Sequence, residues 1–290
     1  MEHINWGIPV AFDLFLAGLG AGALLLATAA DLFGQRRYER ITRTGAALAP
    51  WPVIIGVILL IIDLGQPGRF SHLLFRQGPG VLMVNLNSVM STGVWLLTIF
   101  IILSLVYAAL VFLGWPFTWG RKARRGVGMV TLVVSLLVAV YTGVLLAATS
   151  NPLWNTFLLP AVFSVSALAT GIAAVVFILA LGQTYRARTK TDALVPELEK
   201  INSRVISLQL VVIALFVLLR ITTPSLRMIL GSGYGLLWWI GIIGLGLVVP
   251  LVFGFKGKTR KPQTSVVVAA LVLLGSFFLR YVILIGGQIY

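Results

Sequence analysis

Residues 8–32 read IPVAFDLFLAGLGAGALLLATAADL, and this run decides the fold class. A transmembrane helix needs about 20 mostly apolar residues, and only two carboxylates, Asp13 and Asp31, interrupt this one. Gly18 and Gly22, four residues apart, form a small-residue face of the kind that lets membrane helices approach closely. The run therefore predicts a membrane-spanning helix with a packing face and a carboxylate toward each end.

The rest of the chain has the same character. Of its 290 residues, 59% are hydrophobic and 10% are charged, and its mean hydropathy is +1.02. Soluble domains carry about 25% charged residues. Further runs of sufficient length lie at 46–66, 92–114, 127–149, 157–182, 204–222, 234–254 and 264–285. The sequence predicts an all-α integral membrane protein with eight transmembrane helices in a single domain, 1–290. We expect residues 1–150 to form a first four-helix bundle and residues 157–290 a second half.

The basic residues are distributed unevenly among the loops. Of the 22 lysines and arginines, 17 follow the first, third, fifth and seventh runs. They are Arg36, Arg37, Arg40, Arg43, Arg121, Lys122, Arg124, Arg125, Arg186, Arg188, Lys190, Lys200, Arg204, Lys256, Lys258, Arg260 and Lys261. The positive-inside rule places these loops in the cytoplasm and both termini on the outer, periplasmic side. The net charge of +14 then reflects orientation, with membrane lipid as the partner and no nucleic acid.

Ionisable residues within the membrane are costly and rare, so each is a candidate for function. Asp13 is about 8–9 Å below the outer membrane edge at 1.5 Å per residue, with no cation near it in the sequence. Tyr141 is about 12 Å deep by the same measure, and Asp63 lies near the outer end of the second run. Tyr141 either binds a ligand or satisfies a carbonyl, and Asp63 either joins a site or pairs with Arg69. The pattern predicts a polar pocket in the outer layer of the membrane.

Three other ionisable residues have simpler interpretations. Asp31 lies beside Arg36 and Arg37, which indicates an interfacial ion pair. Arg220 and Arg280 lie near the outer ends of the sixth and eighth runs, where each either extends its charge to the membrane surface or pairs with a neighbour. Arg280 is therefore a second-rank candidate for the predicted pocket.

The loops and the absent residue types narrow the chemistry. Segment 63–91 is glycine-rich and half apolar, so we expect a short interfacial helix and a loop there, whereas 183–203 has the mixed charge of a solvated segment. The chain has no cysteine, which excludes an iron–sulfur cluster or a thiolate metal site of its own. His3 and His72 lie outside the apolar runs, so no buried haem is expected, and we predict no metal site.

Four motifs point to a known family. They are Trp6-Gly7-Ile8-Pro9, Asp63-Leu64-Gly65-Gln66-Pro67-Gly68-Arg69-Phe70, Asn87-Ser88-Val89-Met90-Ser91-Thr92-Gly93-Val94-Trp95, and Tyr141 followed by Asn151-Pro152-Leu153-Trp154-Asn155. With them the sequence resembles the NrfD/PsrC family, the membrane subunits of polysulfide reductase and related molybdenum oxidoreductases. The eight runs fit this resemblance as well.

The resemblance implies a function. Such subunits bind a quinone, menaquinone or ubiquinone, near the outer face of the first four helices and contain no haem. They exchange electrons with an iron–sulfur subunit docked on that face, and a molybdopterin catalytic subunit often lies beyond it. The protein is then expected in the cytoplasmic (inner) membrane of a bacterium or archaeon, oxidising quinol or reducing quinone without holding the complex's catalytic centre. The complex as a whole could also form a homodimer, and the sequence leaves both alternatives.

The resemblance also suggests which residues act. The family's tyrosine in the fourth helix matches Tyr141, and its first-helix histidine falls on Asp13. A carboxylate can likewise accept and release a quinol proton. We therefore expect Asp13 and Tyr141 to be catalytic. The family's first-helix asparagine has no match, because Val10 stands about where it would fall.

Other residues are expected to support the catalytic pair. We expect further quinone contacts from Asp63, Asn87 and Ser88. We expect a proton path that comprises Asp63, His72 and Asp31. One alternative is an ion or small-molecule transporter whose pathway is lined by the buried aspartates and arginines. Another is a purely structural anchor, in which Asp13→Asn leaves quinone-linked activity unchanged.

Overall fold

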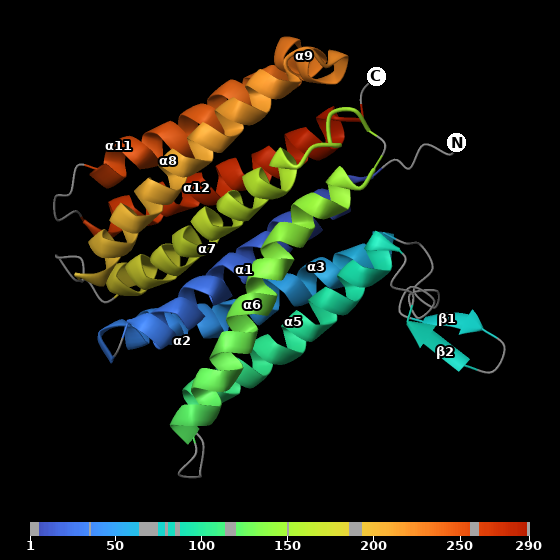
Figure 1. The fold of residues 1–290 in the computed structure, drawn as a ribbon. Helices are drawn as coiled ribbons and strands as arrows, with labels where there is room; N and C mark the ends of the chain where they lie inside the picture. Colours follow the sequence, from blue (N-terminus) through green and yellow to red (C-terminus); the bar gives the residue numbers. More distant parts are fainter. Residues whose placement is uncertain are drawn as a thin grey trace.

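Helices form almost the entire computed structural model (Figure 1). It describes residues 6–34, 36–63, 75–78, 81–84, 88–113, 120–149, 151–185, 193–255 and 261–288. The long helices are α1 (Ile8–Phe33), α3 (Pro50–Asp63), α5 (Val89–Phe112), α6 (Gly120–Ala147), α7 (Leu158–Tyr185), α8 (Leu194–Arg220) and α12 (Pro262–Tyr281). The shorter elements are η1 (Arg36–Tyr38), α2 (Glu39–Leu48), α9 (Pro224–Gly231), α10 (Gly233–Leu236), the π-helix η3 (Leu237–Val248), α11 (Val249–Phe255) and the π-helix η4 (Val282–Gly286).

The described residues contain eight helical segments long and apolar enough to cross a membrane, which confirms the predicted spans. Several segments begin earlier than the hydropathy indicates. The second covers Glu39–Asp63, and the sixth covers Leu194–Arg220. The expectation of a solvated loop over 183–203 is wrong for its described part, because α7 continues to Tyr185 and α8 begins at Leu194. The helices therefore extend past the apolar runs that identified them.

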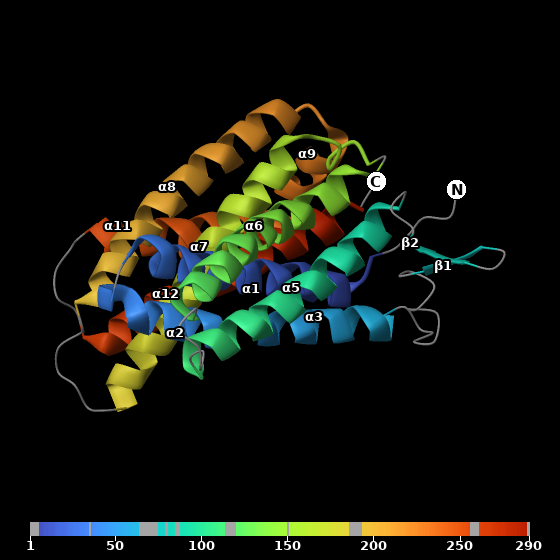
Figure 2. The same ribbon diagram turned by 60° about the horizontal axis from the view of Figure 1, so that its bottom comes forward.

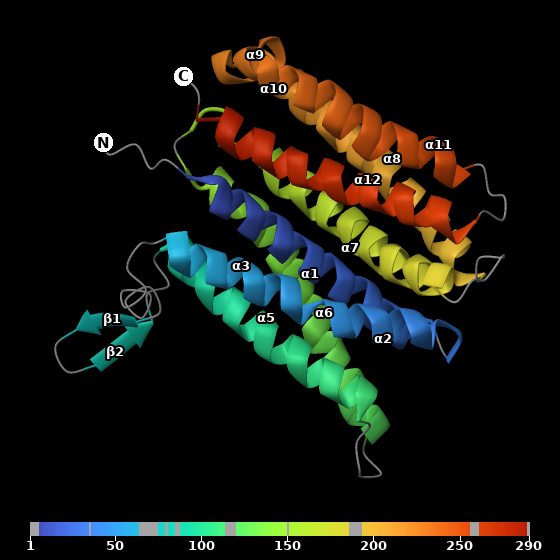
Figure 3. The same cartoon turned by 180° about the vertical axis from the view of Figure 1, so that it is seen from behind.

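Helix α1 lies at the centre of the bundle, between α3 and the pair α7 and α12 (Figure 3). Its glycine face packs on α7: a Cβ atom at Gly22 would overlap the carbonyl of Ala167, and one at Gly171 would overlap the backbone of Gly22. The predicted packing face is thus confirmed. The division into halves at residues 150–157 stays a prediction, since α1 contacts helices on both sides of it.

Both termini lie at one end of the bundle, which we call the terminal end (Figure 1). The backbone N–H of Trp6 donates to Oε1 of Gln288 at 2.7 Å, and Nε2 of Gln288 donates to the Trp6 carbonyl at 3.0 Å. The Trp6 ring also stacks on Trp154 with centroids 5.8 Å apart. We call the opposite end, where α1 and α7 finish and α8 and α12 begin, the basic end.

A small hairpin projects from the terminal end (Figures 1 and 2). Strands β1 (Phe75–Gly78) and β2 (Val81–Val84) pair antiparallel, with Phe75 opposite Val84. The hairpin falls within segment 63–91, for which the sequence indicates a short helix and a loop. The described part of that segment between residues 75 and 84 forms strands instead. The bundle itself is helical as predicted, and the hairpin is a short addition outside it.

Candidate functional site

A cavity of about 190 Å³ opens among α1, α3, α5 and α6 in the terminal half of the bundle. Its wall is mostly apolar and includes Val10, Leu14, Leu60, Val94, Leu97 and Leu145. The same wall contains Asp13, Asp63 and Tyr141, so the structure brings together the three residues that depth alone suggested. A largely apolar pocket with a few converging polar groups is the usual form of a small-molecule site.

Asp13 is buried in this wall, and no described residue gives it a hydrogen bond. Its residue exposure is 5%, and Oδ1 contacts no donor among the described residues. Gly56 of α3 faces it, since a Cβ atom at that position would lie 2.7 Å from Oδ1. A buried acceptor without a partner has a free-energy cost of about 1–3 kcal/mol, more for a charged group. The fold therefore maintains a carboxyl group with an unsatisfied oxygen in a residue that lines the cavity.

Tyr141 is half-buried on the α6 side of the cavity. Its hydroxyl donates to the carbonyl of Val89 at 3.2 Å. Its ring lies against Gly93, where any side chain would overlap the phenol. The carbonyl contact that the sequence left as an alternative is thus present, and the same side chain also lines the cavity.

Asp63 is the last residue of α3, and it lines the cavity although its side chain is exposed. It therefore connects the buried space with the surface of the terminal end. Ser88 caps α5, with its Oγ accepting from the Ser91 N–H at 3.5 Å, and it does not line the cavity. Asn87 and His72 lie outside the described residues, so their roles stay predictions.

The two arginines near the outer helix ends both have protein partners. Arg280 is fully buried on the side of α1 away from the cavity. Its Nε donates to the carbonyl of Leu14 at 3.1 Å, and Nη1 donates to Oγ of Ser276 at 2.6 Å. Arg220 donates to the carbonyl of Asn155. The interpretation of Arg280 as a surface-reaching side chain is therefore wrong, and it does not join the pocket.

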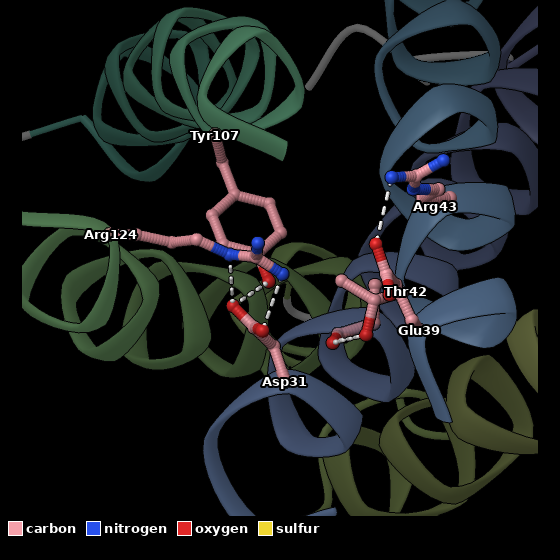
Figure 4. A network of polar contacts seen from close by, with 7 residues as sticks. Asp31, Glu39, Thr42, Arg43, Tyr107 and Arg124 are labelled. Carbon is pink, nitrogen blue, oxygen red and sulfur yellow. Dashed lines mark hydrogen bonds and ion pairs between the residues drawn. The ribbon is translucent and has the colours of Figure 1, made fainter. Parts of the chain in front are cut away.

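Asp31 makes an ion pair with a different partner from the one predicted (Figure 4). It accepts from Nε and Nη2 of Arg124 at 2.8 and 2.5 Å and from the Tyr107 hydroxyl at 2.9 Å. The adjacent Arg37 does not pair with it and instead contacts Glu197 of α8 at 2.8 Å. The pairing favours a structural role for Asp31, and its place in a proton path stays a prediction.

Glu197 also accepts from the Tyr38 hydroxyl at 2.5 Å. This hydrogen bond raises the pKa of the Tyr38 phenol. Together with Arg37, the contact fixes the first turn of α8 beside η1.

The sequence alone did not identify Gly56 and Gly93 as residues of the site. Gly56 lies within an apolar run, where nothing links it to Asp13. Gly93 belongs to one of the quoted motifs, and its structural function is to make space for Tyr141. The site can hold a flat, mostly apolar molecule between an unpartnered proton acceptor and a phenol.

Comparison with known proteins finds relatives that match nearly the whole chain. The family described as "Polysulphide reductase, NrfD" matches residues 1–290. A polysulfide reductase polypeptide of Wolinella succinogenes is 30% identical, over 98% of this sequence and 95% of its own length. A protein NrfD homolog of Haemophilus influenzae is 29% identical over 99% and 95%, and a selenate reductase subunit of Mesobacillus selenatarsenatis is 23% identical over 99% and 75%.

Proposed function

The protein belongs to the NrfD polysulphide reductase family, and on this premise we propose that it is the quinone-reactive membrane subunit of an oxidoreductase complex. In this role it exchanges electrons between the membrane quinone pool and a docked iron–sulfur subunit. The observation that carries the proposal is the unpartnered Oδ1 of Asp13 in the wall of the apolar cavity.

The residues present fit a quinone head group. The cavity has a volume of about 190 Å³. One water molecule needs about 10–15 Å³, so the cavity can hold a much larger molecule. The apolar wall suits a flat ring, and the ring oxygens need the polar groups that Asp13 and Tyr141 supply. Gly56 and Gly93 keep both side chains in their places at the edge of the space.

A bound quinol supplies two electrons and two protons when it is oxidised. Asp13 is the group that accepts a proton, because its residue lines the cavity and its carboxyl accepts no hydrogen bond from a described residue. Tyr141 offers its hydroxyl as a hydrogen-bond donor, and its contact with Val89 at 3.2 Å is at the long end of the normal range. Asp63, exposed at the end of α3, passes protons between Asp13 and the surface. Ser88 caps α5 at this end, and Asn87 and His72 keep the roles that the sequence predicts for them.

The orientation and partners follow from the same proposal. The terminal end faces the outside of the cytoplasmic membrane of a bacterium or archaeon, because the basic loops belong in the cytoplasm. The iron–sulfur subunit docks on the terminal end, close to the cavity, and a molybdopterin subunit binds beyond it. Relatives named as components of polysulfide and selenate reductases support this assembly.

The transporter alternative receives less support from α1. Between Asp13 and Asp31, its only side chain with a polar group is Thr28, whose hydroxyl donates to the Leu24 carbonyl at 2.8 Å within the same helix. A route for ions along α1 would need more polar groups at this depth. The polar chemistry of α1 is confined to its two ends.

The test is binding of a fluorescent quinol analogue to the purified full-length protein. We expect saturable quenching in the wild type. Asp13→Asn should weaken binding roughly 10- to 100-fold, since a hydrogen bond to a charged group contributes about 1.5–3 kcal/mol. Tyr141→Phe should weaken it roughly fivefold, the equivalent of a neutral hydrogen bond.

Asp31→Asn is the matched control, because it removes the other carboxylate of the same helix at a distance from the cavity. Its affinity should equal that of the wild type. If all variants bind as tightly as the wild type, the residue assignment is wrong. If the wild type shows no saturable binding even with its iron–sulfur partner, the quinone function itself is wrong.

A further inference from the structure

Two motif segments that the proposed function does not use meet at the terminal end. One begins with Trp6 and precedes α1, and the other covers residues 151–155 between α6 and α7. A residue near the end of the chain completes the arrangement, because Trp6 hydrogen-bonds to Gln288 and stacks its ring on Trp154. We call these three residues, Trp6, Trp154 and Gln288, the terminal clasp.

Trp6 belongs both to the terminal clasp and to the cavity. It is half-buried, and it lines the same cavity as Asp13. Its ring lies nearly parallel to that of Trp154, with an interplanar angle of 22° and centroids 5.8 Å apart. Trp154 is buried and does not line the cavity. Trp6 therefore lies between Trp154 and the cavity, with one face of its indole already covered by an aromatic ring.

The ring on which Trp6 stacks is itself held by the end of the last membrane span. Nε1 of Trp154 donates to the carbonyl of Ile283 in η4 at 2.8 Å. Nδ2 of Asn151 donates to the carbonyl of Gly287 at 2.7 Å. Gly287 packs so closely on Trp154 that a Cβ atom at this position would overlap the indole. The position of Trp154 is thus fixed by contacts with residues 283–287.

Gln288 holds the backbone of Trp6 from both sides of the residue. Its Oε1 accepts from the Trp6 N–H at 2.7 Å, and its Nε2 donates to the Trp6 carbonyl at 3.0 Å. Nε2 also donates to the carbonyl of Leu284 at 3.0 Å, which anchors the amide on η4. Helix α1 begins only at Ile8, and its N-cap, Gly7, makes no side-chain capping hydrogen bond. The position of Trp6 therefore depends on Gln288 and Trp154.

We propose that Trp6 is a ring-binding residue of the quinone site, and that Gln288 and Trp154 position it. This inference rests on the proposed function, because it names a further contact of the same quinone. Aromatic rings attract one another in offset or edge-to-face arrangements with centroids about 4.5–7 Å apart. The indole of Trp6, together with Tyr141, gives the cavity wall its aromatic surface. Such a contact favours a flat conjugated ring over an aliphatic lipid chain.

The experiment uses the purified full-length protein in detergent, labelled with 5-fluorotryptophan and titrated with the fluorescent quinol analogue. ¹⁹F NMR follows the eight tryptophans, and the variants Trp6→Phe and Trp51→Leu identify two of the resonances. We expect the Trp6 resonance to shift and to saturate with the dissociation constant that fluorescence quenching gives. Trp51 is the internal control, because it is 60% exposed on α3 and does not line the cavity. Its resonance should show no saturable shift.

The variants separate contact from positioning. Trp6→Leu should weaken analogue binding about three- to tenfold, the equivalent of one aromatic contact, whereas Trp6→Phe should weaken it less than about twofold. Trp51→Leu is the matched control and should bind like the wild type. Gln288→Ala should shift the Trp6 resonance even without the analogue, and should weaken binding no more than Trp6→Leu does. In the Trp6→Leu background, Gln288→Ala should have no further effect on binding, because it acts through Trp6.

The wild-type titration decides even if Trp6→Leu fails to fold. A Trp6 resonance that does not shift while the analogue binds saturably would overturn this inference and leave the quinone function standing. A folded Trp6→Leu variant with wild-type affinity would do the same. Additive losses from Trp6→Leu and Gln288→Ala would overturn the positioning role of Gln288. No saturable binding to the wild type, even with its iron–sulfur partner, would overturn the quinone function and this inference with it.

Discussion

Asp13 and Asp31 are the same residue type on the same helix, yet their surroundings are opposite. At 1.5 Å per residue they lie about 27 Å apart along α1. Asp31 accepts from both Arg124 and Tyr107, whereas Oδ1 of Asp13 accepts from no described residue. A carboxylate with strong partners ties helices together, and one without partners beside a cavity is available for a ligand. The helices packed around α1 therefore determine which aspartate can be reactive.

Replacing Asp13 by asparagine should have the largest effect on activity. In the complex assembled with its partner subunits, we expect quinol oxidation to fall about 10²–10⁴-fold, the usual contribution of a positioned acid or base. Stability should be nearly unchanged, because asparagine has almost the same shape and the Asp13 oxygen Oδ1 gives up no hydrogen bond from a described residue. Steady-state quinol oxidation and Tm measure the two effects separately.

Asp31→Asn provides the comparison for this prediction. It should keep quinol oxidation near the wild-type rate and lower Tm. If the two variants lose activity equally, the contrast between the two aspartates would be wrong.

Removing the counter-charge of Asp31 should have the largest effect on stability. Arg124→Ala leaves the carboxylate with Tyr107 alone. The side chains of Arg124 and Asp31 are 28% and 16% exposed, so the loss should lie between that of surface and buried pairs, about 1–3 kcal/mol. Unfolding in mixed detergent micelles measures it.

A double-mutant cycle with Asp31→Asn checks the origin of this loss. We expect Arg124→Ala to cost much less when Asp31 is already neutral. Strictly additive losses would show that the ion pair contributes little and that Arg124 acts through packing.

Gly93→Ala should have a smaller, local effect at the cavity. The added Cβ atom would overlap the Tyr141 phenol, so the ring must leave its place beside Val89. We expect quinol-analogue affinity to fall about tenfold, which corresponds to about 1.4 kcal/mol. Gly126→Ala on α6 is the control, because nothing lies within 4 Å of its added Cβ atom. Equal affinities in the two variants would contradict the role of Gly93.

The sequence predicted the parts of this molecule that depend on local composition. The eight spans follow from hydropathy, and Asp13 and Tyr141 could be placed at one depth from the helical rise. It could not predict that Asp31 pairs with Arg124 rather than Arg37, because that depends on how α1 and α6 pack.

The same limit explains the missed glycines and a second cavity. Gly56 has a role only because α3 lies against Asp13. Glu199 and Asn202 were part of an expected solvated segment, whereas in the structure they line a small second cavity among α7, α8, α11 and α12. Local patterns identify helices and polar groups, whereas contacts between distant segments determine which polar groups remain unpaired.

The smallest predicted effects concern two tyrosines: Tyr107, which donates to Asp31, and Tyr141, which lines the same cavity as Asp13. Tyr107 is fully buried and donates to Asp31 at 2.9 Å, so Tyr107→Phe should lower stability by about 1 kcal/mol and leave quinol-analogue binding unchanged. Tyr141→Phe should weaken quinol-analogue binding and leave stability nearly unchanged. Its hydroxyl makes only a long hydrogen bond to the Val89 carbonyl, and the residue lines the cavity. Measuring Tm and analogue affinity on both variants tests this directly. If Tyr107→Phe alone weakened analogue binding, the two ends of α1 would be coupled, and the separation between a structural end and a reactive end would fail.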